Sequence, residues 1–198
     1  LVLDGVREEI LSEQVIEDIK VRTCFVTKQS RANALRNGEE LQHCPDVEYP
    51  VHGADVIKIP GLLRETAFEV LFPEDNDHLG LAYIIIDAIL KCPVDTRKDL
   101  AENILLIGGT SSVMGMKPRL RDELVKLIQS DYYKERLYVN EVKFHSAPSK
   151  PNFTAWLGGS IYSATDLIVN SINRENYLKS PRIPDWISFD NASPRTKG

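Results

Sequence analysis

The residues with the clearest chemical potential are two glycines between a candidate strand and a candidate helix. Residues 104–110 (ILLIGGT) run from a short apolar segment into Gly108 and Gly109 and then Thr110. Glycines at such a junction expose backbone N–H groups that can bind a phosphate or a sugar. The spacing matches neither the dinucleotide fingerprint nor a Walker loop. Taken alone, the pattern fits either an anion-binding loop or a plain tight turn.

Other reactive side chains do not form a catalytic or metal-binding set by their spacing. Ser160 follows two glycines, but it lacks the second flanking glycine that a hydrolase elbow requires. The histidines and cysteines lack the paired or helical spacing of a metal site, at His43, His52, His78, His145, Cys24, Cys44 and Cys92. We therefore predict no catalytic residue and no metal ligand. Three widely spaced cysteines are also typical of a reducing cytosol.

Hydrophobic periodicity predicts a mixed α/β chain. Apolar or alternating runs indicate strands within 51–59, at 104–107 and around Val142 and Phe144. Helical spacing predicts helices around Val15 and Ile19, from Pro60-Gly61 to Leu71, at 81–90, at 96–102, after the glycine turn through Ile128, and from Thr154. The chain therefore contains a strand, glycine turn and helix in succession.

Four local features carry further expectations. The polar segment from Gln29 to Pro50 is typical of an exposed, mobile loop. Asp95 has the side chain of a helix N-cap. Trp156 and Trp186 are expected to be core anchors, because large aromatic side chains are usually buried. Acidic residues near the start are typical of a solvated helix face, at Glu8, Glu9, Glu13, Glu17 and Asp18.

Composition narrows the function classes. The chain has 198 residues, of which 42% are hydrophobic and 27% charged, so it can bury a sizeable core. Its net charge of -5 and its scattered basic residues disfavour nucleic-acid binding. The apolar stretch around 79–90 is interrupted by Asp87 and is too short to span a bilayer. Because the sequence begins at Leu1 with residues that already read as packed structure, we expect a fragment.

Several segments, in order along the chain, resemble actin and together cover nearly all of it. They are Asp18-Ile19-Lys20 with Cys24, residues 91–100 (KCPVDTRKDL), residues 107–110 (IGGT), Ala147-Pro148, and residues 156–161 (WLGGSI). Within that superfamily, residues 17–26, 100–103 and 182–186 (RIPDW) resemble the actin-related protein 10 class, a subunit at the pointed end of dynactin. The basic-residue, Cys and Phe ending of conventional actin is missing.

The resemblance implies the actin fold, in which two ribonuclease-H-like lobes close over ATP or ADP with a divalent cation. The chain matches the C-terminal half of that fold. Residues 1–78 resemble part of the small outer subdomain of one lobe, and residues 79–153 resemble the large inner subdomain of the same lobe. Residues 154–198 resemble the segment that returns to the missing lobe.

The resemblance also implies binding residues. Those that match the turn on the adenosine and phosphate side of the actin cleft are Gly108, Gly109, Thr110 and Ser112, and Lys20 matches a lysine on the adenine side. Val21 stands where actin has a glutamate that hydrogen-bonds the ribose, and Asn152 stands where it has a lysine. Losing that acid removes an interaction of roughly 1.5–3 kcal/mol if nothing replaces it.

The function implied by the resemblance is structural. It is a non-catalytic dynactin subunit that caps the pointed end of an actin-like filament and supports dynein-driven transport along microtubules. Its partners would be other dynactin subunits in the cytoplasm and cytoskeleton, without nucleic acid or membrane insertion. Two alternatives stay open: an actin-like ATPase that regulates filament assembly, and a nuclear actin-related protein of a chromatin remodeller. The ending at residues 182–186 disfavours the second alternative.

Overall fold

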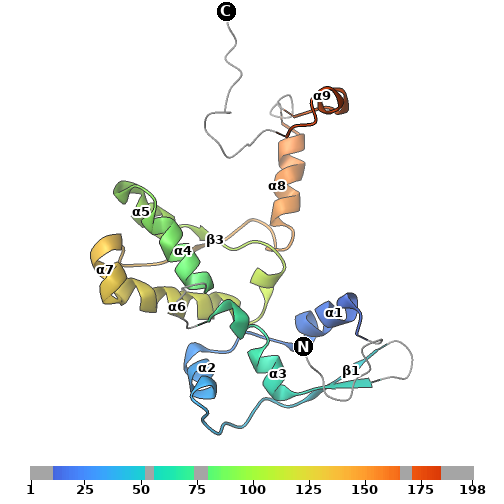
Figure 1. The fold of residues 1–198 in the computed structure, drawn as a ribbon, viewed down its shortest axis with the longest axis vertical. Coiled ribbons are helices and arrows are strands. Elements are labelled where there is room, and N and C mark those ends of the chain that lie inside the picture. The colour runs from blue at the N-terminus through green and yellow to red at the C-terminus, as the bar shows by residue number, and fades with distance from the viewer. Residues whose placement is uncertain (1–10, 52–55, 74–79, 166–170, 184–198) are drawn as a thin grey trace, which may run out of the picture. The chain divides into compact units, whose positions relative to one another are not determined.

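The computed structural model describes residues 11–51, 56–73, 80–165 and 171–183. The chain divides into two compact units, Leu1–Ala155 and Trp156–Gly198. Figure 1 labels the α-helices of both units and some of the strands.

The first unit mixes short helices with two small sheets (Figure 1). Its elements are α1 (Glu13–Thr23), α2 (Gln29–Arg36), β1 (Val47–Pro50), β2 (Val56–Ile59), α3 (Gly61–Thr66), the 3-10 helix η2 (Glu69–Leu71), α4 (Leu81–Leu90), α5 (Val94–Glu102), β3 (Ile104–Leu105), the 3-10 helix η3 (Thr110–Ser112), α6 (Met116–Gln129), α7 (Asp131–Leu137) and β4 (Phe144–His145). Strands β1 and β2 pair antiparallel, whereas β3 and β4 pair parallel. The α/β prediction is confirmed.

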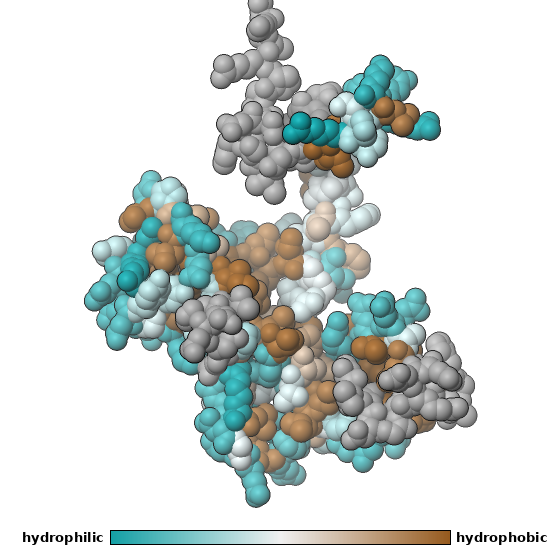
Figure 2. All heavy atoms as spheres, in the orientation of Figure 1, coloured by the Kyte–Doolittle hydropathy of each residue, from teal (hydrophilic) through white to brown (hydrophobic). Residues whose placement is uncertain are grey.

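The larger hydrophobic core of this unit lies between α4, α6 and α7. Ile86 of α4 is fully buried, as are Leu120 and Leu124 of α6 and Leu137 of α7. Each such side chain contributes about 1.5–3 kcal/mol when it leaves water. Figure 2 shows hydrophilic residues over much of the visible outer surface and hydrophobic residues gathered between the elements. The helices predicted at 81–90 and after the glycine turn are thereby confirmed.

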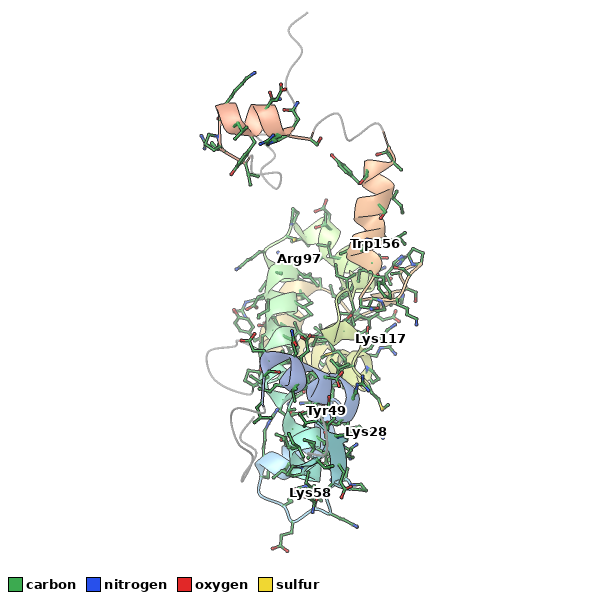
Figure 3. All side chains as sticks on the ribbon, turned by 90° about the vertical axis from the view of Figure 1, so that its right-hand side faces the viewer. Lys28, Tyr49, Lys58, Arg97, Lys117 and Trp156 are labelled. Carbon is green, nitrogen blue, oxygen red and sulfur yellow. The ribbon has the colours of Figure 1, made fainter. Side chains whose placement is uncertain are left out.

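A smaller core joins α1 to the β1–β2 hairpin. Val15 and Ile19 of α1 pack with Ile57 and Ile59 of β2, whose side chains alternate between exposed and buried. Tyr49 of β1 lies beside α1, where its hydroxyl donates a hydrogen bond to the Asp18 carboxylate (Figure 3). These contacts fix which face of α1 points away from the hairpin.

The prediction that Gln29 to Pro50 forms one exposed loop was wrong. Residues 29–36 form α2, because the otherwise polar segment buries Ala32 and lies against α6. Residues 47–50 form β1, because β2 supplies its hydrogen-bonding partner. Both elements depend on residues distant in sequence, so the local composition did not reveal them.

Two predicted element ends also differ. Pro93, not Asp95, is the N-cap of α5, and Asp95 lies in the first turn of the helix instead. An acidic side chain in a first turn is still favoured there, because it faces the positive end of the helix dipole. The strand predicted at 104–107 is shorter, since only Ile104 and Leu105 pair with β4.

The second unit contains most of helix α8 (Thr154–Ser163), which begins in the first unit, and helix α9 (Arg174–Lys179). Neither helix buries a residue. Trp156 is 73% exposed and extends from α8 (Figure 3), so the prediction of a core anchor was wrong at this position. Trp186 lies outside the described residues. In the described ranges, no helix has both the length and the apolar character to cross a membrane.

One charged side chain lies at the centre of the first unit. The side chain of Arg119 on α6 is fully buried and binds both carboxylate oxygens of Glu69, at 2.9 and 3.1 Å. It also donates to Glu123 at 2.7 Å and to the carbonyl of Thr27 at 2.8 Å, and it stacks over the ring of Phe72. Every face of the guanidinium is therefore matched by an acceptor or an aromatic ring.

We expect Arg119→Met to destabilise the protein by about 3–5 kcal/mol, because it leaves two partly buried carboxylates without their shared cation. Urea unfolding followed by circular dichroism would measure the change. The control is Asp122→Asn, an exposed charge on the same helix that should shift the free energy of unfolding by less than about 0.5 kcal/mol. Equal effects of the two variants would contradict the assignment.

A second buried carboxylate connects α3 to the segment before β1. Glu65 is 1% exposed and accepts hydrogen bonds from Arg31 at 2.8 and 3.0 Å and from the backbone N–H of Cys44. Burial by itself raises the pKa of the Glu65 carboxyl, but these donors outweigh it. The net result holds that pKa below its ordinary value of 4.5.

A depressed folded-state pKa gives stability that is fully present above the unfolded value and is lost as pH falls through the folded value. Stability should therefore decline as pH falls below about 4.5. In Glu65→Gln, stability at pH 7 should be lower and this decline shallower, as urea unfolding between pH 7 and pH 3 would show. Glu48→Gln, which changes an exposed carboxylate on β1, should keep the full decline.

Candidate functional site

A cleft of about 1100 Å³ opens in the first unit between α1 and the turn that follows β3. Four of the five predicted binding residues line it: Lys20, Gly109, Thr110 and Ser112. The fifth, Gly108, immediately precedes the lining part of the turn. Residues almost ninety positions apart in the sequence thus contribute to one cavity, whose volume slightly exceeds the range of roughly 300–1,000 Å³ that is usual for small-molecule sites.

The glycine turn has a fixed shape. Gly108 has φ +90°, a conformation that residues with a side chain rarely adopt. Its N–H donates to the carbonyl of Pro151 at 2.8 Å, and its own carbonyl accepts from the Ser111 hydroxyl at 2.7 Å. Residues 110–112 then form η3. The turn is therefore held on both sides of Gly108, with Gly109 facing the cleft.

The segment that follows α1 and the segment that precedes α6 run close together beside the cleft. The N–H of Val26 donates to the carbonyl of Met114 at 2.9 Å. Gly115 has φ +85°, and a Cβ atom there would lie 2.1 Å from the Val26 carbonyl oxygen. The chain can therefore run from α1 past the turn at this distance only because residue 115 has no side chain.

Arg64 supports the α1 wall from α3. Its side chain donates to the carbonyl of Thr23 at 2.8 Å and to the carbonyl of Pro45, and it lies over the ring of Phe25 at 5.9 Å from the centroid. None of these three partners is a carboxylate, so none of them neutralises the charge of Arg64. The side chain thus both positions the wall and adds positive charge to the cleft.

The cleft is predominantly basic. Its charged lining residues are Lys20, Arg22, Arg64 and Lys150 with a single carboxylate, Glu17. The charge of Arg22 is offset by an ion pair with Asp18 at 2.8 Å. Three cations remain in a chain whose net charge is -5, so the local field favours an anionic ligand such as a phosphate.

The two positions that depart from the actin pattern also lie in this cleft. Val21 lines it with an apolar side chain that is 63% exposed, and Asn152 lines it with an amide. Across the stretches that the structure describes, no group of three His, Cys, Asp or Glu side chains is close enough to hold a metal ion.

Several lining residues were missed by the sequence reasoning. Phe25 lies within the matched segment 17–26 but was assigned no binding role. Arg64, Phe68, Met114 and Lys150 belong to no motif, and their spacing gives no signal. They reach the cleft because α3 and the chain after β4 fold against α1 and the glycine turn. Only contacts between distant segments could have identified them.

Comparisons with known proteins agree with this architecture. The sequence model of the actin family matches residues 8–177. The chain is 30% identical to actin-related protein 10 of Dictyostelium discoideum over 216 aligned positions, which cover 94% of this chain and 44% of that protein. It is also similar to actin-related protein 4 of Oryza sativa subsp. indica (30% identity; 76% of this chain, 34% of that protein) and of Arabidopsis thaliana (29%; 76% and 35%).

The chain therefore belongs to the actin family, and its α/β fold is a partial actin-like fold. It spans less than half the length of the curated relatives that it matches. The resemblance stated from the motifs is confirmed at the level of the family and of the actin-related proteins.

The close contact between Gly115 and Val26 can be tested by substitution. Gly115→Ala should destabilise the protein by more than about 2 kcal/mol, because the left-handed backbone strain adds to a clash with Val26. Gly38→Ala is the matched control: Gly38 has φ +75°, but nothing lies within 4 Å of a Cβ there. That variant should lose only about 1–2 kcal/mol. Thermal or urea unfolding measures both, and equal losses would refute the close approach at Gly115.

Proposed function

We propose that this chain is the C-terminal half of a non-catalytic actin-related subunit of dynactin. In this proposal the subunit caps the pointed end of the actin-like filament and supports dynein-driven transport along microtubules. The observation that carries it is the similarity to an actin-related protein 10, which extends over 94% of the chain. The similarities to actin-related protein 4 extend over 76%. Its partners would be other dynactin subunits in the cytoplasm.

The division of the chain follows from the same proposal. Residues 1–78 would belong to the small outer subdomain, residues 79–153 to the large inner subdomain, and residues 154–198 to the segment that returns to the other lobe. The exposed apolar side chains of α8 support the last assignment, since Trp156 and Ile161 are more than half exposed and unburied by their own unit. Apolar side chains of this size are usually covered in a complete protein.

The cleft would hold ATP or ADP as a structural ligand. Arg64 and Lys150 would supply positive charge for the phosphates, the turn from Gly109 to Ser112 would supply backbone groups and hydroxyls, and Lys20 would lie on the adenine side. The nucleotide would contribute negative charge and a rigid body between the two walls. A divalent cation would accompany the phosphates, as the family resemblance implies.

The lining residues bear on the choice between a structural and a hydrolytic role. Hydrolysis requires a group that orients or deprotonates a water molecule. Among the described residues that line the cleft, Glu17 is the only carboxylate and there is no histidine. An actin-like ATPase is the alternative, and its water-activating groups would lie in the part of the relatives that this chain does not span.

The capping role has a geometric basis. Head-to-tail contacts between identical subunits propagate into open filaments. A subunit that keeps one of the two complementary surfaces and has changed the other binds at an end and stops growth. Helix α2 and strand β1 are candidates for such a changed surface, because they lie in the polar segment Gln29–Pro50, which contains none of the actin-like motifs.

A nuclear role is the second candidate, because two of the relatives are named actin-related protein 4 and match about three quarters of the chain. Affinity purification of the tagged intact protein from cell extract separates the two. We expect dynactin subunits to co-purify at near-equal amounts. Recovery of chromatin-remodelling subunits instead would overturn the dynactin proposal, and ATP turnover coupled to polymer growth would overturn the non-catalytic one.

A further inference from the structure

The cleft contains one negative charge among its cations, and its position suggests a specific use. We propose that the Glu17 carboxylate accepts hydrogen bonds from the vicinal hydroxyls of a ribose and makes the cleft selective for ribonucleotides. This inference rests on the proposed binding of a nucleotide in the cleft. It assigns to Glu17 a role that the acidic-face interpretation of the sequence did not include.

One face of helix α1 places Glu17 on the wall of the cleft. Glu17, Lys20 and Val21 follow the spacing i, i+3, i+4, so they share one face of the helix, and all three line the cleft. Val15 and Ile19 on the opposite side are buried against the β1–β2 hairpin. Because that packing fixes the rotation of α1, Glu17 stays on the wall of the cleft.

The Glu17 carboxylate is available to accept hydrogen bonds. Glu17 is exposed, and it forms no ion pair or hydrogen bond with another residue in the described ranges. Its neighbour Asp18 differs, because it binds both Arg22 and the Tyr49 hydroxyl. Both oxygens of Glu17 are therefore available as acceptors. A carboxylate that binds two adjacent hydroxyls is a common mode of ribose recognition.

The hydroxyl groups of the cleft are already engaged or lie on the opposite wall. On the α1 wall, the Thr23 hydroxyl is already used, since it donates to the carbonyl of Ile19 at 2.7 Å. The hydroxyls of Thr110 and Ser112 lie on the opposite wall, with the backbone groups suited to phosphates. Glu17 is thus the strongest acceptor on the α1 side, one helical turn from the apolar Val21. A ribose oriented toward α1 would meet this carboxylate.

The test compares nucleotides that differ by one hydroxyl group. Isothermal titration calorimetry would measure the affinity of the intact protein for ATP, 2′-deoxyATP and 3′-deoxyATP. We expect each deoxynucleotide to bind at least about tenfold more weakly than ATP, because a hydrogen bond to a charged acceptor is lost. In Glu17→Gln the preference should fall to about twofold or less, since a neutral amide accepts more weakly than a carboxylate. Glu13→Gln, an exposed acid one turn earlier on α1 and outside the cleft, should keep the full preference.

Each result separates this inference from the proposed function. Equal affinities for ATP and the deoxynucleotides in the unaltered protein would overturn the role of Glu17 and leave nucleotide binding intact. A full preference retained in Glu17→Gln would do the same. Failure of all three nucleotides to bind would overturn nucleotide binding itself, and the role of Glu17 with it. An unchanged circular dichroism spectrum and melting temperature of Glu17→Gln would show that its binding reports on the cleft.

Discussion

The first unit depends on a buried guanidinium. Removing the charge of Arg119 from water is unfavourable unless its donors are matched, and Glu69, Glu123 and the Thr27 carbonyl match them. These partners come from three separate places in the chain, so one side chain fixes η2, α6 and the segment after α1 together. Arg36 of α2 extends the network by binding Glu69 at 3.0 Å.

The two walls of the cleft inherit their positions from this interaction. Helix α6 begins directly after Gly115, which ends the glycine turn on one wall. Thr27 continues the segment from Thr23 to Phe25 on the other wall. Both walls therefore lead to the same guanidinium, and the hydrogen bond between Val26 and Met114 joins them on the way. The buried interaction that stabilises the unit therefore also positions the two walls of the candidate site.

The charge of the cleft also depends on how the charged side chains are paired. Backbone carbonyls place the Arg64 side chain, so it keeps its charge for a ligand. Several carboxylates elsewhere in the unit are engaged in structural pairs, as Glu65 is with Arg31. A basic cleft in an acidic chain arises from this separation of roles. If a nucleotide occupies the cleft, as proposed above, the departures at Val21 and Asn152 would make its recognition differ in detail from that of actin.

The sequence by itself determined the features whose cause is local. The apolar spacing of residues 81–90 and of Leu120 and Leu124 fixed two helices and their buried faces, and the glycines at 108 and 109 marked the turn. The ordered motifs identified the family. Only the tertiary structure decided that residues 29–36 form a helix and 47–50 a strand. It also decided that Trp156 is exposed, and that Arg119 is the centre of the core. In each of these cases the deciding partner lies far away in the sequence, and burial and hydrogen bonding across such distances leave no periodicity in the chain itself.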